Sequence, residues 1–390
     1  MKYDVAIVGG GPAGLYCALL LARKKLKVFL CEEHSEIGYP LCCGEAVSKY
    51  INRFFSLPQN CIAKKIEGAK FYSPSGRSIK IIAKNSGYIL NRPLFEKWLC
   101  EKAQREGAQI MLKTKAISVE NSSLIIEREG KKISIKFDYL VAADGPLSRI
   151  ARQLNLSKPI SKDNLFICSG GIYEIGKDFN YLEFYFGERI APGGYLWVFP
   201  KNDGFANIGA GVSPVVASKP RKFLEKFLKE KFKNVKEILR YDGFVPVGEN
   251  VKKVYKNVLV IGDAARVADP ISGAGICNAL LTAEMAAKAI LQGEPKNYER
   301  EWRKLTFKEY LFKQKLKNIV LNMREKDLEE LYKAGKMLTD GRDFTNFEKI
   351  NMYELVFKLV AKNYNLLKFI IRNLRKSLGG RDKQIMISLD

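Results

Sequence analysis

The chain has 390 residues, of which 47% are hydrophobic and 28% are charged, as in folded globular proteins rather than disordered ones. Lys and Arg outnumber Asp and Glu by 66 to 42, and the net charge of +24 favours anionic partners, although Lys-rich surfaces are also typical of thermophilic proteins. The single histidine, His34, and eight cysteines without a C-x-x-C pair exclude multi-histidine metal centres, histidine-based triads and the usual spacing of zinc or iron–sulfur ligands.

The N-terminal segment has the pattern of a βαβ unit, with an apolar strand, an apolar helix and a second strand within residues 4–31. Between the first strand and the helix, Gly9, Gly11 and Gly14 match G-x-G-x-x-G. These glycines permit a tight turn, the close approach of a pyrophosphate and close helix packing. Glu32 follows the second strand, where its carboxylate can accept hydrogen bonds from a ribose. The segment therefore predicts dinucleotide binding.

Two later strand ends favour FAD over NAD. Residues 140–148 form a buried strand followed by Asp-Gly-x-x-Ser, and residues 258–263 form another that ends in Gly-Asp. Asp263 then lies at the carboxyl edge of the sheet, where it can hold the ribityl hydroxyls of a flavin. Gly275 and Ile276 open a helix whose amide groups can face the same ligand. Three such turns in this order predict an FAD site.

The segments between these turns define the expected domain organisation. Residues 91–107 predict a helix, whereas residues 165–212 alternate as strands with glycine turns, which indicates a second sheet. We expect an α/β protein with a Rossmann-type FAD-binding domain, an inserted β-sheet substrate domain and a helical C-terminal region. The expected boundaries are 1–160 for the FAD-binding domain with an inserted β segment, 161–250 for the substrate domain, 251–295 for the returning segment of the FAD domain, and 296–390 for the basic helical region.

The order of these motifs resembles the flavoproteins that include para-hydroxybenzoate hydroxylase, and three stretches resemble the geranylgeranyl reductase family in particular. They are a Cys-Gly loop at residues 38–48, an Arg-x-x-Phe segment within 87–95, and a Y-x-W-x-F-P motif at 195–200 that is followed by Ala-Asn-Ile-Gly at 206–209. The resemblance covers residues 1–290. It implies an FAD-dependent reductase that saturates C=C bonds of geranylgeranyl chains, as in archaeal-type phospholipid precursors or in chlorophyll and quinone precursors.

The resemblance also implies which residues contact the cofactor. They are Ala13, Glu32, Cys43, Gly44, Arg92, Ala116, Asp263, Gly275 and Ile276. The guanidinium of Arg92 suits a pyrophosphate, because it can donate two parallel hydrogen bonds. Cys43 is implied as a catalytic residue beside the flavin and the alkene, whereas the alternative interpretation is a small packed loop residue. The adjacent Cys42 leaves open which thiol lines the site.

The Y-x-W-x-F-P motif predicts a strand with Tyr195, Trp197 and Phe199 on one face. These aromatic side chains either wall a tunnel for a prenyl chain or fill the core of the sheet. Because no metal site is expected, the flavin must carry the redox step. A substrate with a long apolar chain and a phosphate-bearing head also agrees with the positive net charge.

The partners and location are expected from the same pattern. Amphipathic basic stretches at 310–321 and 355–372 either cover the tunnel and dock on an anionic membrane or simply pack on the core. We expect a prenylated lipid substrate, a peripheral position on the cytoplasmic face of the membrane, and no nucleic-acid partner. The electron donor can be ferredoxin, NADPH or a reduced quinone. A flavin-dependent aromatic or quinone monooxygenase and an electron-transfer flavoprotein feeding quinone remain as alternatives, although the second normally needs an iron–sulfur cluster.

Overall fold

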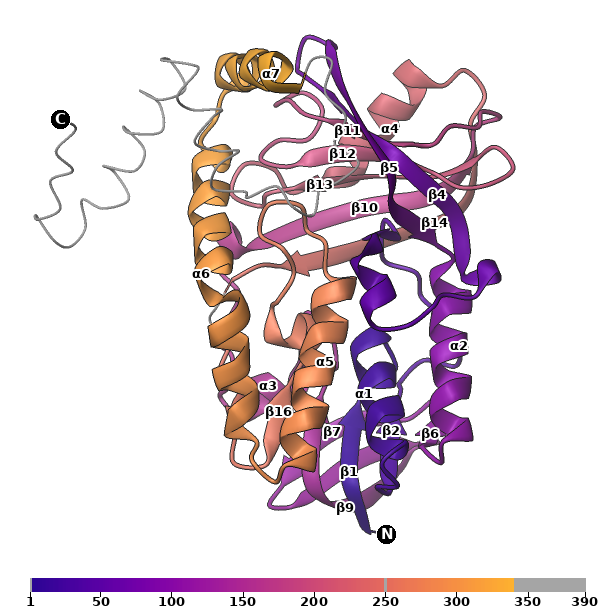
Figure 1. Ribbon diagram of the computed structural model, residues 1–390, viewed down its shortest axis with the longest axis vertical. Helices are drawn as coiled ribbons and strands as arrows, with labels where there is room; N and C mark the ends of the chain where they lie inside the picture. The colour runs from indigo at the N-terminus through magenta and orange to yellow at the C-terminus, as the bar shows by residue number, and fades with distance from the viewer. Residues whose placement is uncertain (1, 249–250, 340–390) are drawn as a thin grey trace, which may run out of the picture.

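The computed structural model describes residues 2–248 and 251–339. This part of the chain forms two eight-stranded sheets, which lie at opposite ends of the molecule in Figure 1. None of its helices is both long and apolar enough to cross a bilayer. Of the basic helical region expected at residues 296–390, the part from 340 to 390, with the amphipathic stretch at 355–372, lies outside the described residues.

The first sheet has a parallel core, as the βαβ pattern predicts. Its strands are β1 (Lys2–Val8), β2 (Val28–Cys31), β6 (Gln109–Met111), β7 (Lys115–Glu120), β8 (Ser123–Arg128), β9 (Lys131–Ala142), β15 (Val254–Tyr255) and β16 (Val258–Val260). The parallel strands run in the order β16-β9-β1-β2-β6, and β7 and β8 extend from β9 as an antiparallel ribbon. Strands β2 and β16 are buried along their whole length, which is why they read as continuous apolar runs.

Three helices cover one face of this sheet. They are α1 (Pro12–Ala22), α2 (Arg92–Arg105) and α5 (Ile276–Leu291), and α1 packs between the other two (Figure 1). This position explains why α1 is apolar almost all round rather than on one face. A short helix, α3 (Arg149–Gln153), follows β9, and the hydroxyl of Ser148 caps it by accepting a hydrogen bond from the Ala151 N–H at 3.0 Å. The predicted helices at 91–107 and after Gly275 are thus confirmed.

The second sheet draws strands from two distant parts of the sequence. They are β3 (Ala46–Ser48), β4 (Ile62–Tyr72), β5 (Ser78–Leu90), β10 (Leu165–Glu174), β11 (Tyr181–Tyr185), β12 (Tyr195–Pro200), β13 (Phe205–Val212) and β14 (Lys236–Pro246). Their order is β14-β10-β13-β12-β11-β4-β5-β3, and the parallel pair β11–β4 joins the two groups. The expected first domain therefore gives β3 to β5 to the second sheet. Local patterns did not show this, because the pairing joins residues more than 100 positions apart.

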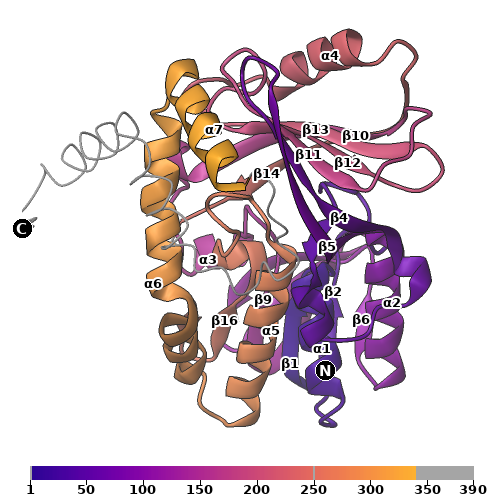
Figure 2. The ribbon, with the colours of Figure 1, turned by 45° about the horizontal axis from the view of Figure 1, so that its top comes forward.

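The remaining helices pack against the second sheet or run beside it. Helix α4 (Pro220–Lys231) packs against β10 and β13, on the face that points away from the first sheet (Figure 2). Helix α6 (Lys296–Leu321) runs alongside both sheets, and α7 (Glu325–Thr339) packs against β5. On α6, the hydroxyl of Tyr310 donates to the Arg266 carbonyl at 2.7 Å, and the Lys317 ammonium donates to the Asp163 carbonyl at 2.6 Å. Helix α6 therefore forms hydrogen bonds with both the segment after β16 and the turn just before β10.

Candidate active site

One cavity lies between the carboxyl ends of the parallel strands and one face of the second sheet. Its volume is about 1490 Å³, which exceeds the roughly 300–1,000 Å³ of typical small-molecule sites and leaves room for a dinucleotide and a second ligand. The expected site residues that line it are Gly9, Gly11, Ala13, Glu32, Cys43, Gly44, Arg92, Ala116, Asp263, Gly275, Ile276, Tyr195, Trp197 and Phe199. The remaining one, Gly14, lies beneath the glycine turn rather than in the wall.

The glycine turn between β1 and α1 forms one end of this cavity. Gly9 has φ +105°, and a Cβ there would lie 2.3 Å from the Ala143 carbonyl oxygen. A Cβ on Gly14 would lie 2.0 Å from the Gly9 carbonyl oxygen, so helix α1 can approach β1 only because this residue lacks a side chain. Apart from its chain neighbours, no atom of the described residues lies within 4 Å of the position a Cβ would take on Gly11. That open space at a helix N-terminus suits a pyrophosphate.

Glu32 is fixed beside the glycine turn by three hydrogen bonds. Its carboxylate accepts the Gly10 N–H at 2.6 Å and the His34 N–H at 2.9 Å, and its Oε1 lies 2.5 Å from the His34 Nδ1. The carboxylate consequently stays at the cavity wall, where a ribose is expected. The sole histidine thus orients a carboxylate on the edge of the cavity.

Asp263 lies in the opposite wall, in the 3₁₀ turn Gly262–Ala265 that follows β16. No group in the described part of the chain donates a hydrogen bond to its side chain. Burial raises the pKa of Asp263, and the nearby charge of Arg92 opposes that shift. Asp263 is half-buried at the cavity wall, and a partly desolvated carboxylate of this kind gains hydrogen bonds when a ligand supplies donors, as a polyol hydroxyl can. The adjacent start of α5, at Ile276, has no side-chain cap, so its free N–H groups also remain for a ligand.

These features fit FAD along the length of the cavity. The glycine turn and the start of α1 offer N–H groups to the pyrophosphate, and Glu32 suits the adenosine ribose. The carboxylate of Asp263 suits the ribityl chain, and the N–H groups at the start of α5 would then be available to the flavin end of the cofactor.

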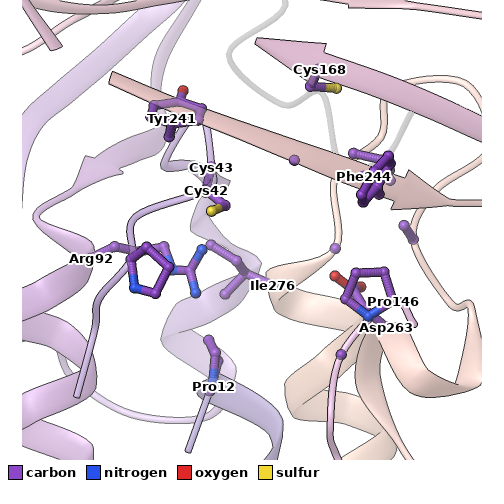
Figure 3. Close-up of a pocket in the computed structure, with 18 of the residues that line it drawn as sticks. Pro12, Cys42, Cys43, Arg92, Pro146, Cys168, Tyr241, Phe244, Asp263 and Ile276 are labelled. Atoms are coloured by element: carbon purple, nitrogen blue, oxygen red, sulfur yellow. The ribbon is translucent and has the colours of Figure 1, made fainter. Parts of the chain in front are cut away.

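Arg92 and Cys43 meet in the middle of the cavity. The Arg92 guanidinium is 2.5 Å from Oε1 of Glu96, a buried residue one turn further along α2, and it also reaches the Cys43 thiol. Figure 3 shows the guanidinium beneath Cys42 and Cys43, with Asp263 across the cavity. The pairing with Glu96 was not expected from the sequence, which assigned Arg92 to a pyrophosphate.

The two neighbouring cysteines differ in their surroundings. Cys42 is exposed, whereas Cys43 is half-buried and its Sγ accepts the Glu45 N–H at 3.2 Å. Burial raises the pKa of the Cys43 thiol, and Arg92 and the Glu45 N–H oppose this shift. Within residues 2–248 and 251–339, no group of three or more His, Cys, Asp or Glu side chains could hold a metal ion.

The aromatic side chains of β12 form the wall of the cavity on the second sheet. Trp197 and Phe199 belong to an apolar cluster on the cavity side with Tyr195 packed against it, whereas Leu196 and Val198 pack on the α4 side. The predicted alternation is therefore present. The Trp197 indole lies flat on β13, because a Cβ on Gly209 would be only 2.2 Å from its Cζ2.

Sequence reasoning missed a set of buried polar residues behind this wall. Glu45 and Asn207 are fully buried, Lys201 is 15% exposed and Tyr241 is 6% exposed. A glutamate two residues after the candidate cysteine and an asparagine inside a strand of small residues were the only sequence patterns that could have indicated them. Their contacts join four separate segments and cannot be read from local spacing.

Two family models match the chain. The model described as the geranylgeranyl reductase catalytic domain matches residues 169–245, and that of the pyridine nucleotide-disulphide oxidoreductases matches residues 3–163. The first match contains the aromatic wall, and the second contains the glycine turn.

Whole-length comparisons agree with these matches. The digeranylgeranylglycerophospholipid reductase of Methanosarcina acetivorans is 32% identical over 94% of both chains, and that of Methanocaldococcus jannaschii is 34% identical over 94% of this chain and 97% of its own. The crystal structure of a geranylgeranyl bacteriochlorophyll reductase-like protein from Thermoplasma acidophilum superposes with a TM-score of 0.86 at 28% identity, covering 96% of this chain and 99% of the other. The flavin-dependent brominase Bmp2, at 17% identity and a TM-score of 0.69, shares the fold over 98% of this chain and 100% of its own. The chain therefore belongs to the geranylgeranyl reductase family of flavoproteins.

Proposed function

We propose that this protein is an FAD-dependent reductase that saturates the C=C bonds of geranylgeranyl chains in digeranylgeranylglyceryl phospholipids. The observation that carries the proposal is the shared cavity. In it, the cradle that fits FAD, formed by the glycine turn, Glu32, Asp263 and the start of α5, faces an apolar aromatic wall. The names of the relatives in the two methanogens support the same substrate class. The alternatives expected from the sequence, a monooxygenase and an electron-transfer flavoprotein, have no comparable support.

FAD held in this cavity would, once reduced, supply the hydride for one carbon of the alkene. We assign to Cys43 the supply of the proton to the other carbon, so that its S–H bond breaks as a C–H bond forms. The guanidinium of Arg92 and the N–H of Glu45 lie at the sulfur and stabilise the thiolate that remains. Water then returns a proton to the thiolate.

The aromatic wall holds the prenyl chain for this step. Trp197 and Phe199 are 6% exposed and line the cavity, with ring centroids 6.2 Å apart. Their faces exclude water from the alkene and restrict its orientation. Trp197→Ala should therefore lower turnover about tenfold, which corresponds to roughly 1.4 kcal/mol, while leaving the flavin in place.

The decisive experiment measures the lipid product. The purified FAD-loaded protein, reduced with dithionite under anaerobic conditions, is incubated with a digeranylgeranylglyceryl phospholipid, and the lipid is analysed by mass spectrometry. The expected product gains two hydrogen atoms for each double bond. Oxygen-dependent oxidation of NADPH with no change in lipid mass would instead support the monooxygenase. Replacing dithionite by ferredoxin, NADPH or a reduced quinone then identifies the electron donor.

We further infer a peripheral position on the cytoplasmic face of an anionic membrane. Val215 and Val216 are 58% and 56% exposed, just before the start of α4, where Lys219 and Lys222 line the end of the cavity. An apolar tip beside cations is suited to an anionic lipid surface that delivers the substrate. The eight free cysteines support a reducing compartment.

Sedimentation with vesicles tests this inference. Phosphatidylglycerol vesicles should bind the protein in a salt-dependent manner, whereas phosphatidylcholine vesicles should not. Lys222→Glu should weaken binding severalfold. The matched control is Lys229→Glu, two turns further along the same face of α4 and away from the cavity; equal losses in both variants would contradict docking at the cavity mouth.

A further inference from the structure

A buried asparagine lies at the centre of a hydrogen-bond network behind the aromatic wall. The Oδ1 of Asn207 accepts the Trp197 Nε1–H at 3.0 Å and the Tyr241 hydroxyl at 2.6 Å. Its Nδ2 donates to the Cys43 carbonyl at 2.8 Å and to Glu45 Oε2 at 3.0 Å. Every hydrogen-bonding group of this amide is therefore used, which fixes its orientation. One side chain thus connects the wall with the backbone of the cysteine loop.

Glu45 extends the network on the loop side. Its carboxylate is fully buried, lies 2.7 Å from the Lys201 ammonium and accepts the Arg92 N–H at 3.1 Å. The residue has φ +65°, a conformation that is uncommon outside glycine. That turn directs the Glu45 side chain into the network and its N–H toward the sulfur of Cys43. The network is consequently coupled to the position of the thiol.

The loop also rests directly on the wall. A Cβ on Gly44 would lie 3.0 Å from the ring of Phe199, so the loop backbone and the aromatic ring are in close contact. Figure 3 shows Cys43 between Tyr241 above and Arg92 below. A small displacement of this loop would therefore move the thiol relative to the wall, which is held by the same asparagine.

We propose that Asn207, Glu45 and Lys201 are positioning residues that hold the Cys43 thiol and the Trp197 ring at fixed places beside the substrate alkene. This proposal rests on the proposed function, because it assigns the network to the same reaction. A buried ion pair contributes little net stability in general, whereas its directional contacts restrict geometry. Removing one partner leaves the other buried without its counter-charge, and the loop must then rearrange.

The pH dependence of Cys43 alkylation measures the environment of the thiol directly. Reaction of the FAD-loaded protein with iodoacetamide between pH 7 and 11, followed by peptide mass spectrometry, separates Cys43 from the exposed Cys42. The titratable and charged groups facing the thiol are Arg92, Glu45, Cys42, Cys168, Tyr195 and Tyr241. In Lys201→Met, the Glu45 charge loses its cation, so we expect the midpoint to rise by roughly half to one pH unit.

The same variant should lower kcat on the prenyl lipid about tenfold with little change in KM or in flavin content. Lys317→Met is the matched control, because Lys317 is 3% exposed and donates to the Asp163 carbonyl and to Asn164 far from the cavity. It should leave the alkylation midpoint unchanged even if it destabilises the protein. Asn207→Asp, which keeps the acceptor atom but loses both donors, provides a second variant and should lower kcat in the same way.

An unchanged alkylation midpoint in Lys201→Met, or an equal change in Lys317→Met, would overturn the positioning role. So would a normal kcat in both network variants. Failure of the proposed function looks different, since the parent protein would then leave the lipid unreduced while the alkylation profiles still report on the network.

Discussion

The two sheets contribute to the cavity by different physical means. On the first sheet the contacts expected for the cofactor come largely from the backbone, at the turn containing Gly9 and Gly11 and at the start of α5. On the second sheet they come from side chains, such as Trp197, which Asn207 holds through a buried hydrogen bond. A backbone cradle needs only a short segment of sequence, whereas a side-chain wall depends on strands brought together by the fold.

The largest effect is expected from a substitution that disrupts the glycine turn of the cradle. In Gly14→Ala the new Cβ would lie 2.0 Å from the Gly9 carbonyl oxygen, so α1 must move away from β1. We expect the free energy of unfolding to fall by about 3 kcal/mol or more, together with loss of most of the bound flavin. Thermal unfolding and the flavin absorbance per mole of protein measure both effects.

Gly11→Ala is the matched variant for that experiment. Within the described part of the chain its Cβ would meet no atom within 4 Å beyond its chain neighbours, so the unfolding temperature of the FAD-free protein should stay unchanged. Its affinity for FAD should nevertheless fall at least about tenfold, because the methyl group occupies the space assigned to the pyrophosphate. Parental affinity in a calorimetric titration would show that the pyrophosphate lies elsewhere.

A smaller effect should distinguish the contribution of the aromatic wall to lipid turnover from that of the cradle to flavin binding. In Gly209→Ala the Cβ would lie 2.2 Å from Cζ2 of Trp197, which lifts the indole and breaks its hydrogen bond to Asn207. We expect kcat/KM for the prenyl lipid to fall about tenfold, about 1.4 kcal/mol, with unchanged flavin content.

The double variant with Trp197→Ala sharpens this prediction. Once the indole is gone, the added methyl group has space, so the two losses in kcat/KM should not add. Simple additivity in the lipid assay would mean that Gly209 acts independently of the ring.

The smallest expected effect concerns the unpartnered carboxylate of the cradle. Burial raises the pKa of Asp263 in the folded FAD-free protein, so that state binds a proton more readily than the unfolded chain. Its stability should therefore fall as pH rises from about 4 through the raised pKa. Asp263→Asn should remove this loss of stability and weaken FAD binding at the same time. Unfolding temperatures between pH 4 and 8 and an FAD titration test both statements; a variant that loses stability without FAD would contradict them.

The contrast between local backbone turns and a wall built from distant strands also explains what the sequence could predict. The glycine turn, Glu32 and the strand end at Asp263 were predictable, because each depends on a strand and the few residues that follow it. Asn207 lay within a recognised motif, but its function depends on Cys43 and Glu45, which are more than 160 positions away. The pairing of β4 with β11 escaped prediction for the same reason. The contact of Arg92 with the cofactor, which the family resemblance implied, stays a prediction, and its ion pair with Glu96 could not be read from the motif.

The wall formed by Trp197 and Phe199 has a consequence for where a polyisoprenoid chain can stop along the site. Apolar contacts distinguish ligands that differ by one methylene only by roughly 1–3 kcal/mol, and successive isoprene units are chemically identical. A chain shifted by one unit along the rings would therefore meet nearly the same surroundings. Under the proposed function, the wall would impose no register on the chain, so one site could serve each repeat in turn as the lipid slides past it.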